Sequence, residues 1–268
     1  NYFFRHTDDY LAAIRNAGCA VYYRLGETIE GRYLPRKTYV VAGRWKPETL
    51  ARVCVNIARH YTEGWADGFE WEIRHWQFWN EPQNGWIKPP HERPCWTGTV
   101  EEFYTLYRAV STAMKAHNPG WHLGLAGYGR PDFIFPPGHP LYREDNPWRH
   151  VEDVVNAGPI DSISWHQYGA SWEDLAASAR MVRECLDTNG LGHAESHLTE
   201  WNYMPRVEDE RGTYTWFDAR AARDVDRLDH IYTVMTGVEG AAYVFGALAR
   251  LQQEPLDLSH LYTAVSTG

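Results

Sequence analysis

The stretch WQFWNEPQNGW, residues 76–86, decides how the rest of the sequence is interpreted. Its apolar beginning ends in Asn80 and Glu81, and Pro82 follows at once. Proline cannot donate a hydrogen bond to a strand ladder, so a strand has to stop at this point. A strand that is apolar on both faces is typical of a buried parallel sheet. The stretch therefore predicts a buried strand with an acid at its carboxyl end, followed by turn residues at positions 83–85.

Extended and helical patterns alternate along the whole chain. The extended segments are residues 19–29, 71–82, 121–129, 160–169, 195–202 and 240–249. The helical segments are residues 8–18, 46–64, 99–120, 171–190 and 218–237, and residues 130–148, rich in Pro and Gly, are expected to form a loop. Thr99 and Glu102 have the spacing of a capping box. Six strands alternating with five helices predict a parallel sheet with helical crossovers.

Several of these strands end in polar or acidic residues. The endings are Asn80-Glu81, His166-Gln167-Tyr168 and Thr199-Glu200. In a (β/α)8 barrel the catalytic groups gather at the carboxyl ends of the strands. A doubly wound open sheet would need a Gly-rich nucleotide loop, and the sequence contains neither GxGxxG nor a P-loop. The sequence therefore predicts an α/β fold, a (β/α)8 TIM barrel, and the lack of repeats or linkers favours a single domain over residues 1–268.

Composition excludes several classes of partner. The net charge of −9 and the absence of a basic stripe make nucleic acid an unexpected ligand. No run approaches the roughly 18 apolar residues of a membrane span, and no membrane partner is expected. The 13 Trp and 17 Tyr suit stacking on sugar rings as well as a heavily aromatic core. The cellular compartment and the oligomeric state cannot be read from the sequence.

The cysteines form no metal or disulfide pattern. Cys19, Cys54, Cys95 and Cys185 are far apart and include no CxxC pair. We expect buried free thiols rather than a zinc site or a disulfide framework. The segment HAESH, residues 193–197, is not a metalloprotease helix, because its Glu is misplaced for HExxH.

Two glutamates stand in similar settings at the ends of predicted strands. Glu81 lies in FWNEP and Glu200 lies in LTEWN. Paired carboxylates across a barrel mouth are the groups that glycoside hydrolysis uses: one protonates the departing oxygen, and the other attacks the anomeric carbon or activates water. A single Glu is most often a solvent-exposed loop acid, so the shared setting of the two matters more than either alone.

The segments WQFWNEP, SWHQY (residues 164–168) and LTEWN resemble glycoside hydrolase clan A, and within it family 39, the β-xylosidases and α-L-iduronidases. The resemblance runs from residues 8–18 through 50–61 to 229–238. It implies a retaining double displacement without metal or organic cofactor. Glu81 would be the general acid/base and Glu200 the nucleophile, while Asn80 would hydrogen-bond the sugar 2-hydroxyl. Such a mechanism requires Glu200 ionised and Glu81 protonated in the same site.

Further residues are candidates for contacts with a sugar. Ser164, His166 and Tyr168 alternate onto one face of their strand, and the larger two could orient Glu200 or contact the sugar; packed structural roles are equally open. Other candidates near strand ends are Arg24, Glu27, Gln77, Trp86, Tyr128, Trp201 and Tyr243. An Arg at the rim could meet a uronic acid carboxylate.

The sequence departs from the family pattern in three places. Gln77 stands where many relatives have an acid, four residues before the acid/base. Residues 240–249, expected as strand eight, lack the usual Trp platform, for which Tyr243 or Phe245 could substitute. The six predicted strands correspond to strands three to eight of the family barrel. A barrel without two strands would expose long edges, so we expect upstream sequence to complete it.

Three functions remain open at this point. The first is a retaining, exo-acting glycosidase for a β-xyloside-like or related sugar. The second is a carbohydrate-binding barrel that has lost turnover, which Gln77 and the missing Trp keep under consideration. The third is an endo-acting polysaccharide hydrolase or lyase of the same clan, which an open cleft would favour. A carbohydrate ligand is expected in all three cases.

Overall fold

The computed structural model describes residues 2–26, 46–86, 95–129 and 151–262. The expected loop at 130–148 lies outside these residues. The chain divides into two compact units, which are described separately below. The first unit comprises Asn1–Gly127 and Arg149–Ile163, and the second comprises Tyr128–Trp148 and Ser164–Gly268.

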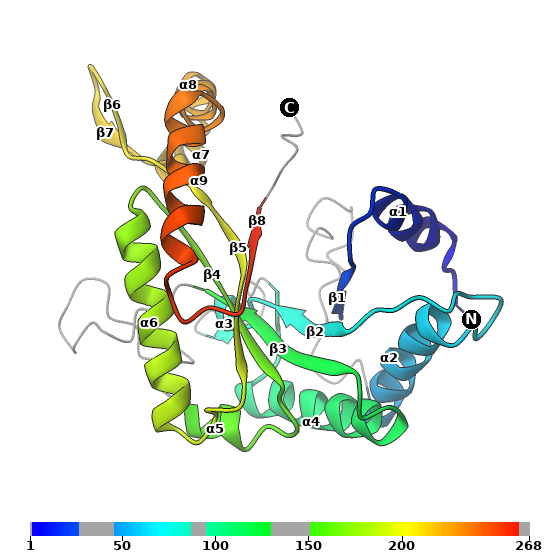
Figure 1. Ribbon diagram of the computed structural model, residues 1–268. Helices are drawn as coiled ribbons and strands as arrows, with labels where there is room; N and C mark the ends of the chain where they lie inside the picture. The colour runs from blue at the N-terminus through cyan, green and yellow to red at the C-terminus, as the bar shows by residue number, and fades with distance from the viewer. Residues whose placement is uncertain (1, 27–45, 87–94, 130–150, 263–268) are drawn as a thin grey trace. The chain divides into compact units, whose positions relative to one another are not determined.

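A parallel sheet runs through the fold, as the alternating pattern predicted (Figure 1). In sheet order, its described strands are β1 (Tyr22–Leu25), β2 (His75–Asn80), β3 (His122–Tyr128), β4 (Ser162–Gly169), β5 (Glu195–Tyr203) and β8 (Leu258–Leu261). The pairings of β1 with β2, β2 with β3 and β5 with β8 are parallel. Four of these strands fall within the segments predicted to be extended, β5 extends one residue beyond its segment, and β8 lies outside all of them.

The first unit carries helices where the sequence predicted them. Its helices are α1 (Arg5–Asn16), α2 (Pro47–Thr62), α3 (Gln83–Trp86), α4 (Val100–His117) and α5 (Val151–Val155). The capping box at the start of α4 is confirmed: the Thr99 hydroxyl accepts from the Glu102 amide, and the Glu102 carboxylate accepts from the Thr99 amide. The short helices α3 and α5 were not predicted.

An aromatic core fixes β2 in the first unit. Every residue of β2 after His75 is buried, as expected for a strand covered on both faces. The Phe78 ring lies 5.6 Å from the rings of both Phe103 and Tyr107 on α4. Burying one such side chain stabilises the fold by about 1.5–3 kcal/mol. This packing holds the strand rigid up to its carboxyl end, where Asn80 and Glu81 follow.

The second unit is built on β4, β5 and β8. Its helices are α6 (Trp172–Thr188), α7 (Trp216–Ala222), α8 (Val225–Thr236) and α9 (Val238–Leu251). Helix α9 packs against α6, α8 and β5. The side-chain oxygen of Ser171 caps α6 by accepting from the Asp174 amide. Strand β5, which carries Glu200, is therefore backed by helices α6 and α9 of its own unit.

The prediction of a last strand at residues 240–249 is wrong. These residues belong to α9, and the last strand is β8. A short apolar run cannot be assigned by periodicity alone, and the 14-residue length with its Ala and Leu content decides for a helix. Tyr243 and Phe245 therefore lie on a helix rather than on strand eight. The missing platform cannot be replaced by them in the way the sequence suggested.

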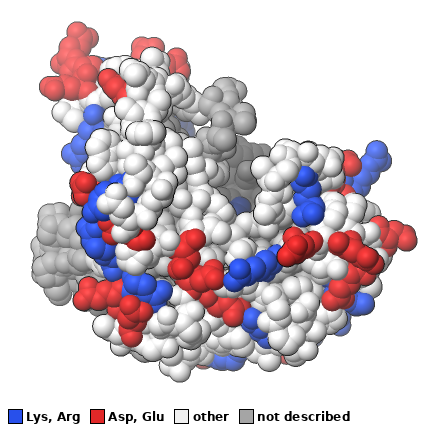
Figure 2. Space-filling model, in the orientation of Figure 1, with Lys and Arg blue, Asp and Glu red and all other residues white. Residues whose placement is uncertain are grey.

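The helix predicted at residues 218–237 is two helices. It breaks at Arg223, whose φ of 55° is left-handed, and the Asp224 carboxylate then caps α8 by accepting from the Arg227 amide. Before α7, an unpredicted hairpin forms from β6 (Val207–Asp209) and β7 (Gly212–Tyr214). Acidic side chains cover its tip, at the upper left of Figure 2.

The cysteines agree only in part with the expectation. They form no disulfide with one another. Cys54 is buried, and its burial raises the pKa of the thiol to about 12. Cys19 is exposed, so the prediction of a buried thiol is wrong there, and Cys95 and Cys185 are partly buried. Among the described residues no single helix is long and apolar enough to span a membrane, although the bent pair α8 and α9 reaches that length and composition together.

Candidate active site

The backbone leaves the strand geometry at the carboxyl end of β2. Trp79 has a φ of 70° and Glu81 a φ of 45°, both left-handed. The Glu81 amide still donates to the Gly127 carbonyl of β3, at 2.9 Å. Left-handed backbone at non-glycine residues costs of order 1–3 kcal/mol and clusters at functional sites. Two such residues stand within three positions at this strand end, which makes it a candidate for a functional role.

Two hydrogen bonds and the space left by Gly26 accommodate Trp79 in this conformation. Its indole nitrogen donates to the Cys95 carbonyl at 2.8 Å, and the Gln77 side chain donates to the Trp79 carbonyl at 3.1 Å. Gly26, with a φ of +124°, leaves room for the ring, since a Cβ there would lie 2.7 Å from Trp79 Cε3. Gln77 was a candidate for sugar contact. The structure shows it supporting the backbone two residues along its own strand.

Arg24 and Asn80 meet at neighbouring strand ends. Arg24 Nη1 donates to Asn80 Oδ1 at 2.6 Å. Asn80 is 3% exposed, and its Nδ2 has no hydrogen-bond partner among the described residues. Buried amide nitrogens almost always donate to something in native structures. The amide group of Asn80 is thus oriented by Arg24 and retains a donor for a ligand or a water molecule.

Asn84 contacts Glu81 directly, which the sequence did not suggest. Residues 83–85 were predicted to be turn residues, and they form most of the one-turn helix α3 instead. Asn84 Nδ2 donates to Glu81 Oε2 at 2.9 Å, and the Asn84 amide donates to the Glu81 carbonyl at 3.2 Å. A carboxyl group is therefore held by a neutral donor three residues downstream.

Glu200 sits in a bulge inside β5, in the second unit. The register pairs Leu198 with Ser259 and Trp201 with Leu261, so β5 advances by three residues while β8 advances by two. The extra residue falls at Thr199-Glu200. Such bulges re-aim side chains and recur beside active sites. The predicted strand end at Glu200 is not its true end, because β5 continues to Tyr203.

Two candidates from β4 reach the Glu200 carboxylate. The Tyr168 hydroxyl donates to Glu200 Oε2 at 2.9 Å. His166 Nδ1 lies 3.6 Å from the same oxygen, and the His166 side chain is almost fully buried. Both side chains project from the face predicted for Ser164, His166 and Tyr168, which places them beside the carboxylate rather than on the outer face of β4.

Three buried polar atoms of β4 and β5 lack hydrogen-bond partners among the described residues. Gln167 Oε1, Thr199 Oγ1 and Trp201 Nε1 are buried and make no hydrogen bond with any described residue. Native proteins leave few buried polar groups unpaired. Period two turns Gln167 to the face of β4 opposite to His166 and Tyr168. The Trp201 ring lies 6.5 Å from the ring of Tyr243 on α9.

The aromatic candidates pack in the interior. Tyr128, the last residue of β3, is 1% exposed, and Trp201 is fully buried. Tyr243 lies 4.9 Å from the Tyr203 ring and 6.5 Å from the Trp201 ring, and burial raises its pKa to about 12. Phe245 is 78% exposed on α9. Of the remaining candidates, Glu27 lies outside the described residues and Trp86 is described only by its backbone.

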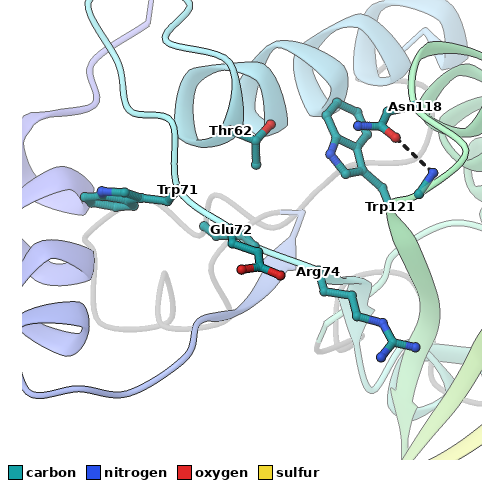
Figure 3. A pocket seen from close by; sticks show the side chains of 8 residues that line it. Thr62, Trp71, Glu72, Arg74, Asn118 and Trp121 are labelled. Atoms are coloured by element: carbon teal, nitrogen blue, oxygen red, sulfur yellow. Dashed lines mark hydrogen bonds between the residues drawn. The ribbon is translucent and has the colours of Figure 1, made fainter.

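A cavity in the first unit lies at the opposite ends of the strands. It has a volume of about 350 Å³ and is lined by Thr62, Trp71, Glu72, Ile73, Arg74, Asn118, Gly120 and Trp121 (Figure 3). Arg74 immediately precedes β2 and Trp121 immediately precedes β3, so the cavity faces the amino-terminal ends. Phe69 stacks on Trp71 with ring centroids 3.9 Å apart, and His117 stacks on Trp121 at 5.3 Å. Glu81 does not line this cavity.

Known proteins share the fold. No family profile matches the chain. It is 26% identical over 198 residues to a β-xylosidase of Caldicellulosiruptor saccharolyticus, a match covering 67% of this chain and 34% of that protein. Among solved structures it resembles a glucosidase from Croceicoccus marinus, with a TM-score of 0.65, 22% identity, and 97% of this chain covering 45% of that one.

Two further solved structures are similar to this chain over nearly its whole length. A monomeric β-xylosidase from Caulobacter crescentus has a TM-score of 0.59 at 16% identity, over 97% of this chain and 49% of that chain. A GH51 α-L-arabinofuranosidase from Thermotoga petrophila has a TM-score of 0.57 at 13% identity, over 96% of this chain and 46% of that chain. These likenesses confirm the predicted (β/α)8-type fold. The chain spans about a third of the curated relative and less than half of each structure.

Proposed function

We propose that this chain carries the catalytic centre of a glycoside hydrolase of clan A, most similar to family 39. The observation that carries the proposal is the placement of two glutamates at irregular points near strand carboxyl ends, each with a hydrogen-bond donor on its carboxylate. Support comes from relatives of the same fold that are themselves glycosidases. Carboxylates at this end of a barrel are the usual position of catalytic groups.

The proposed reaction is a double displacement with retention at the anomeric carbon. In the first step the Glu200 carboxylate forms a bond to that carbon while the glycosidic C–O bond breaks, and Glu81 gives its proton to the departing oxygen. The leaving group departs as a neutral alcohol. In the second step Glu81, now a carboxylate, takes a proton from water, whose oxygen attacks the glycosyl-enzyme and releases Glu200.

The neighbours of the two glutamates fit these tasks. Tyr168 donates to Glu200 and fixes the orientation of the attacking carboxylate. Asn80 presents an amide oriented by Arg24, whose remaining donor suits the sugar 2-hydroxyl oxygen. The proposed double displacement requires no metal or organic cofactor. The substrate proposed is a β-xyloside-like or related sugar, cleaved in an exo fashion.

The test is the release of nitrophenol from a panel of aryl glycosides, with β-xyloside, α-arabinoside and α-iduronide included. Glu81→Gln and Glu200→Gln are assayed beside the parent, with Glu184→Gln, an exposed helix glutamate, as the matched control. NMR of the first product anomer then reports the stereochemistry. We expect one sugar to turn over with retention, both active-site variants to lose activity, and the control to keep it.

Other outcomes would replace the proposal. An inverted product would remove the nucleophile role of Glu200 and make it a general base. Binding of sugars detected by calorimetry, without any turnover, would favour a carbohydrate-binding barrel. Activity on polysaccharides but on no aryl monosaccharide would favour the endo-acting hydrolase.

A further inference from the structure

Within the proposed function, the general acid must deliver its proton from one defined oxygen. A protonated carboxyl group has one O–H and one carbonyl oxygen, and they exchange roles if the group turns about its last bond. The efficiency of proton transfer depends on the proton lying within hydrogen-bond reach of the acceptor. Some feature near Glu81 therefore has to decide which oxygen carries the proton.

Asn84 contacts one oxygen of that carboxyl group. Its Nδ2 donates to Glu81 Oε2 at 2.9 Å, and an amide nitrogen can only donate. The carbonyl oxygen of a carboxylic acid is a better acceptor than its hydroxyl oxygen, so this bond favours the protonated form in which Oε2 is the carbonyl oxygen and Oε1 carries the proton. The contact thus distinguishes the two oxygens chemically as well as geometrically.

The amide of Asn84 is itself fixed in position. Its backbone amide donates to the Glu81 carbonyl at 3.2 Å, which closes a turn between the two residues. Gln83 Nε2 lies 3.5 Å from Asn84 Oδ1, so the amide oxygen faces Gln83 and the nitrogen faces Glu81. Gln83 is 6% exposed and thus part of the packed interior. The left-handed φ of Glu81 begins the turn that brings these groups together.

We propose that Asn84 is a positioning residue for the general acid, holding Glu81 Oε2 as an acceptor so that Oε1 carries the proton to the glycosidic oxygen. The inference rests on the proposed function of Glu81. It assigns to the segment after Pro82 a role beyond turning the chain. It also separates Asn84 from Asn80: the first acts on the acid, the second on the sugar.

The experiment compares kcat/KM of the parent, Asn84→Ala and Asn84→Asp on aryl glycosides of one sugar, from poor leaving groups to dinitrophenolate. Poor leaving groups need protonation, whereas dinitrophenolate departs without it. Loss of a hydrogen bond to a group of this kind corresponds to about 10- to 100-fold in rate. We expect both Asn84 variants to lose kcat/KM by that factor on the glycoside with the poorest leaving group, and by less than about threefold on the dinitrophenyl glycoside. Asn16→Ala, at the exposed end of α1, is the matched control.

A structural readout decides the question independently of turnover. In crystals of Asn84→Ala we expect the Glu81 carboxyl plane to turn away from its parent orientation, while the backbone at Glu81 stays in place. A carboxyl group with unchanged orientation would overturn the proposal, and so would an equal rate loss for all leaving groups. If the parent protein hydrolyses no glycoside, the proposed function fails, and the crystals still show whether Asn84 positions Glu81.

Discussion

An irregular backbone positions each of the two candidate catalytic glutamates, and the irregularity differs between them. Glu81 stands just past the end of β2, where the chain leaves the strand with a left-handed residue and turns into α3. Glu200 stands inside β5, in a bulge, and the strand continues beyond it. A side-chain amide donates a hydrogen bond to the Glu81 carboxylate, and a phenol donates one to the Glu200 carboxylate.

The difference matches the demands of the two proposed roles. A nucleophile has to meet the anomeric carbon in one orientation, and groups built on strands are held more precisely than groups on loops. Glu200 lies within β5, with strand residues before and after it in the chain, and its donor Tyr168 lies on β4. A general acid must both give and take a proton during one cycle, and Glu81 lies in a turn with a neutral donor. The irregular backbone thus carries a carboxylate of the proposed site in both places.

The largest effect is expected from deleting each carboxylate in turn and supplying azide. Glu200→Gly should lower activity on the order of 10⁴-fold or more, and Glu81→Gly about 10²–10⁴-fold on substrates that need protonation. With an activated β-glycoside, azide should give an inverted glycosyl azide with Glu200→Gly, by direct attack on the substrate. It should give a retained azide with Glu81→Gly, by attack on the glycosyl-enzyme. NMR of the azide products identifies them.

The opposite pairing of products would exchange the roles of the two residues and break the comparison. Equal azide products from both variants would mean that the two carboxylates do not act on opposite faces of the sugar. The Glu184→Gly variant should give no azide product beyond that of the parent, since Glu184 is exposed on α6.

A smaller effect is expected from Tyr168→Phe, which removes the donor to Glu200 and keeps the ring. Loss of a hydrogen bond to a charged group should lower kcat/KM by about 10- to 100-fold. The loss should be the same for good and poor leaving groups, because the nucleophile acts with both. Tyr232→Phe, on the exposed side of α8, is the control. A loss that depended on the leaving group would place Tyr168 with the acid instead of the nucleophile.

Much of this arrangement could be predicted from the sequence. The apolar run before Asn80 predicted a buried strand, and β2 is that strand. The alternation in SWHQY predicted one face for His166 and Tyr168, and both lie beside Glu200. These inferences succeed because burial and period two act on neighbouring residues.

Two other features could not be predicted from the sequence, one because it depends on a distant strand and one because it depends on an unusual backbone conformation. The bulge at Glu200 exists only in relation to β8. The sequence predicted the last strand at residues 240–249 instead, because periodicity alone does not distinguish a short apolar strand from a helix such as α9. The contact of Asn84 with Glu81 needs the left-handed φ at Glu81, and no local residue preference predicts that conformation for Glu. The turn preference of Asn predicted a turn at residue 84, where the structure has the helix α3, and it did not indicate the contact with Glu81.

The strain at the end of β2 can be tested through Gly26. Gly26→Ala places a Cβ 2.7 Å from the Trp79 ring at a φ of +124°, so both space and backbone oppose it. The free energy of unfolding should fall by about 1–3 kcal/mol in chemical denaturation. Gly169→Ala, where a Cβ would meet nothing within 4 Å, is the control. An unchanged free energy of unfolding would mean that the Trp79 ring moves aside at no cost, and that Gly26 after β1 does not constrain the backbone before Glu81.

The smallest effect is expected in the hairpin that follows β5. Arg227 donates to both oxygens of Asp209, at 2.6 and 2.8 Å, and holds the pKa of that carboxyl well below its usual range, with Arg211 adding to the effect. A lowered folded pKa means that Asp209 stabilises the fold above its unfolded pKa of about 3.9, and that this stability is lost as the pH falls through the folded value. Asp209→Asn should therefore lower Tm at pH 7, and the difference from the parent should shrink as the pH falls below 4.

Glu208→Gln, the exposed neighbour on the same strand, should leave Tm unchanged across this range. A difference between Asp209→Asn and the parent that persists undiminished at low pH would mean that the side chain contributes through shape rather than charge. Turnover measured on the same variant extends the comparison of the two glutamates. If Asp209→Asn also lowers kcat/KM, the order of the hairpin is transmitted along the chain to Glu200. If kcat/KM is unchanged, the bulge in β5 and the Tyr168 contact are sufficient to place the nucleophile, and the hairpin acts on stability alone.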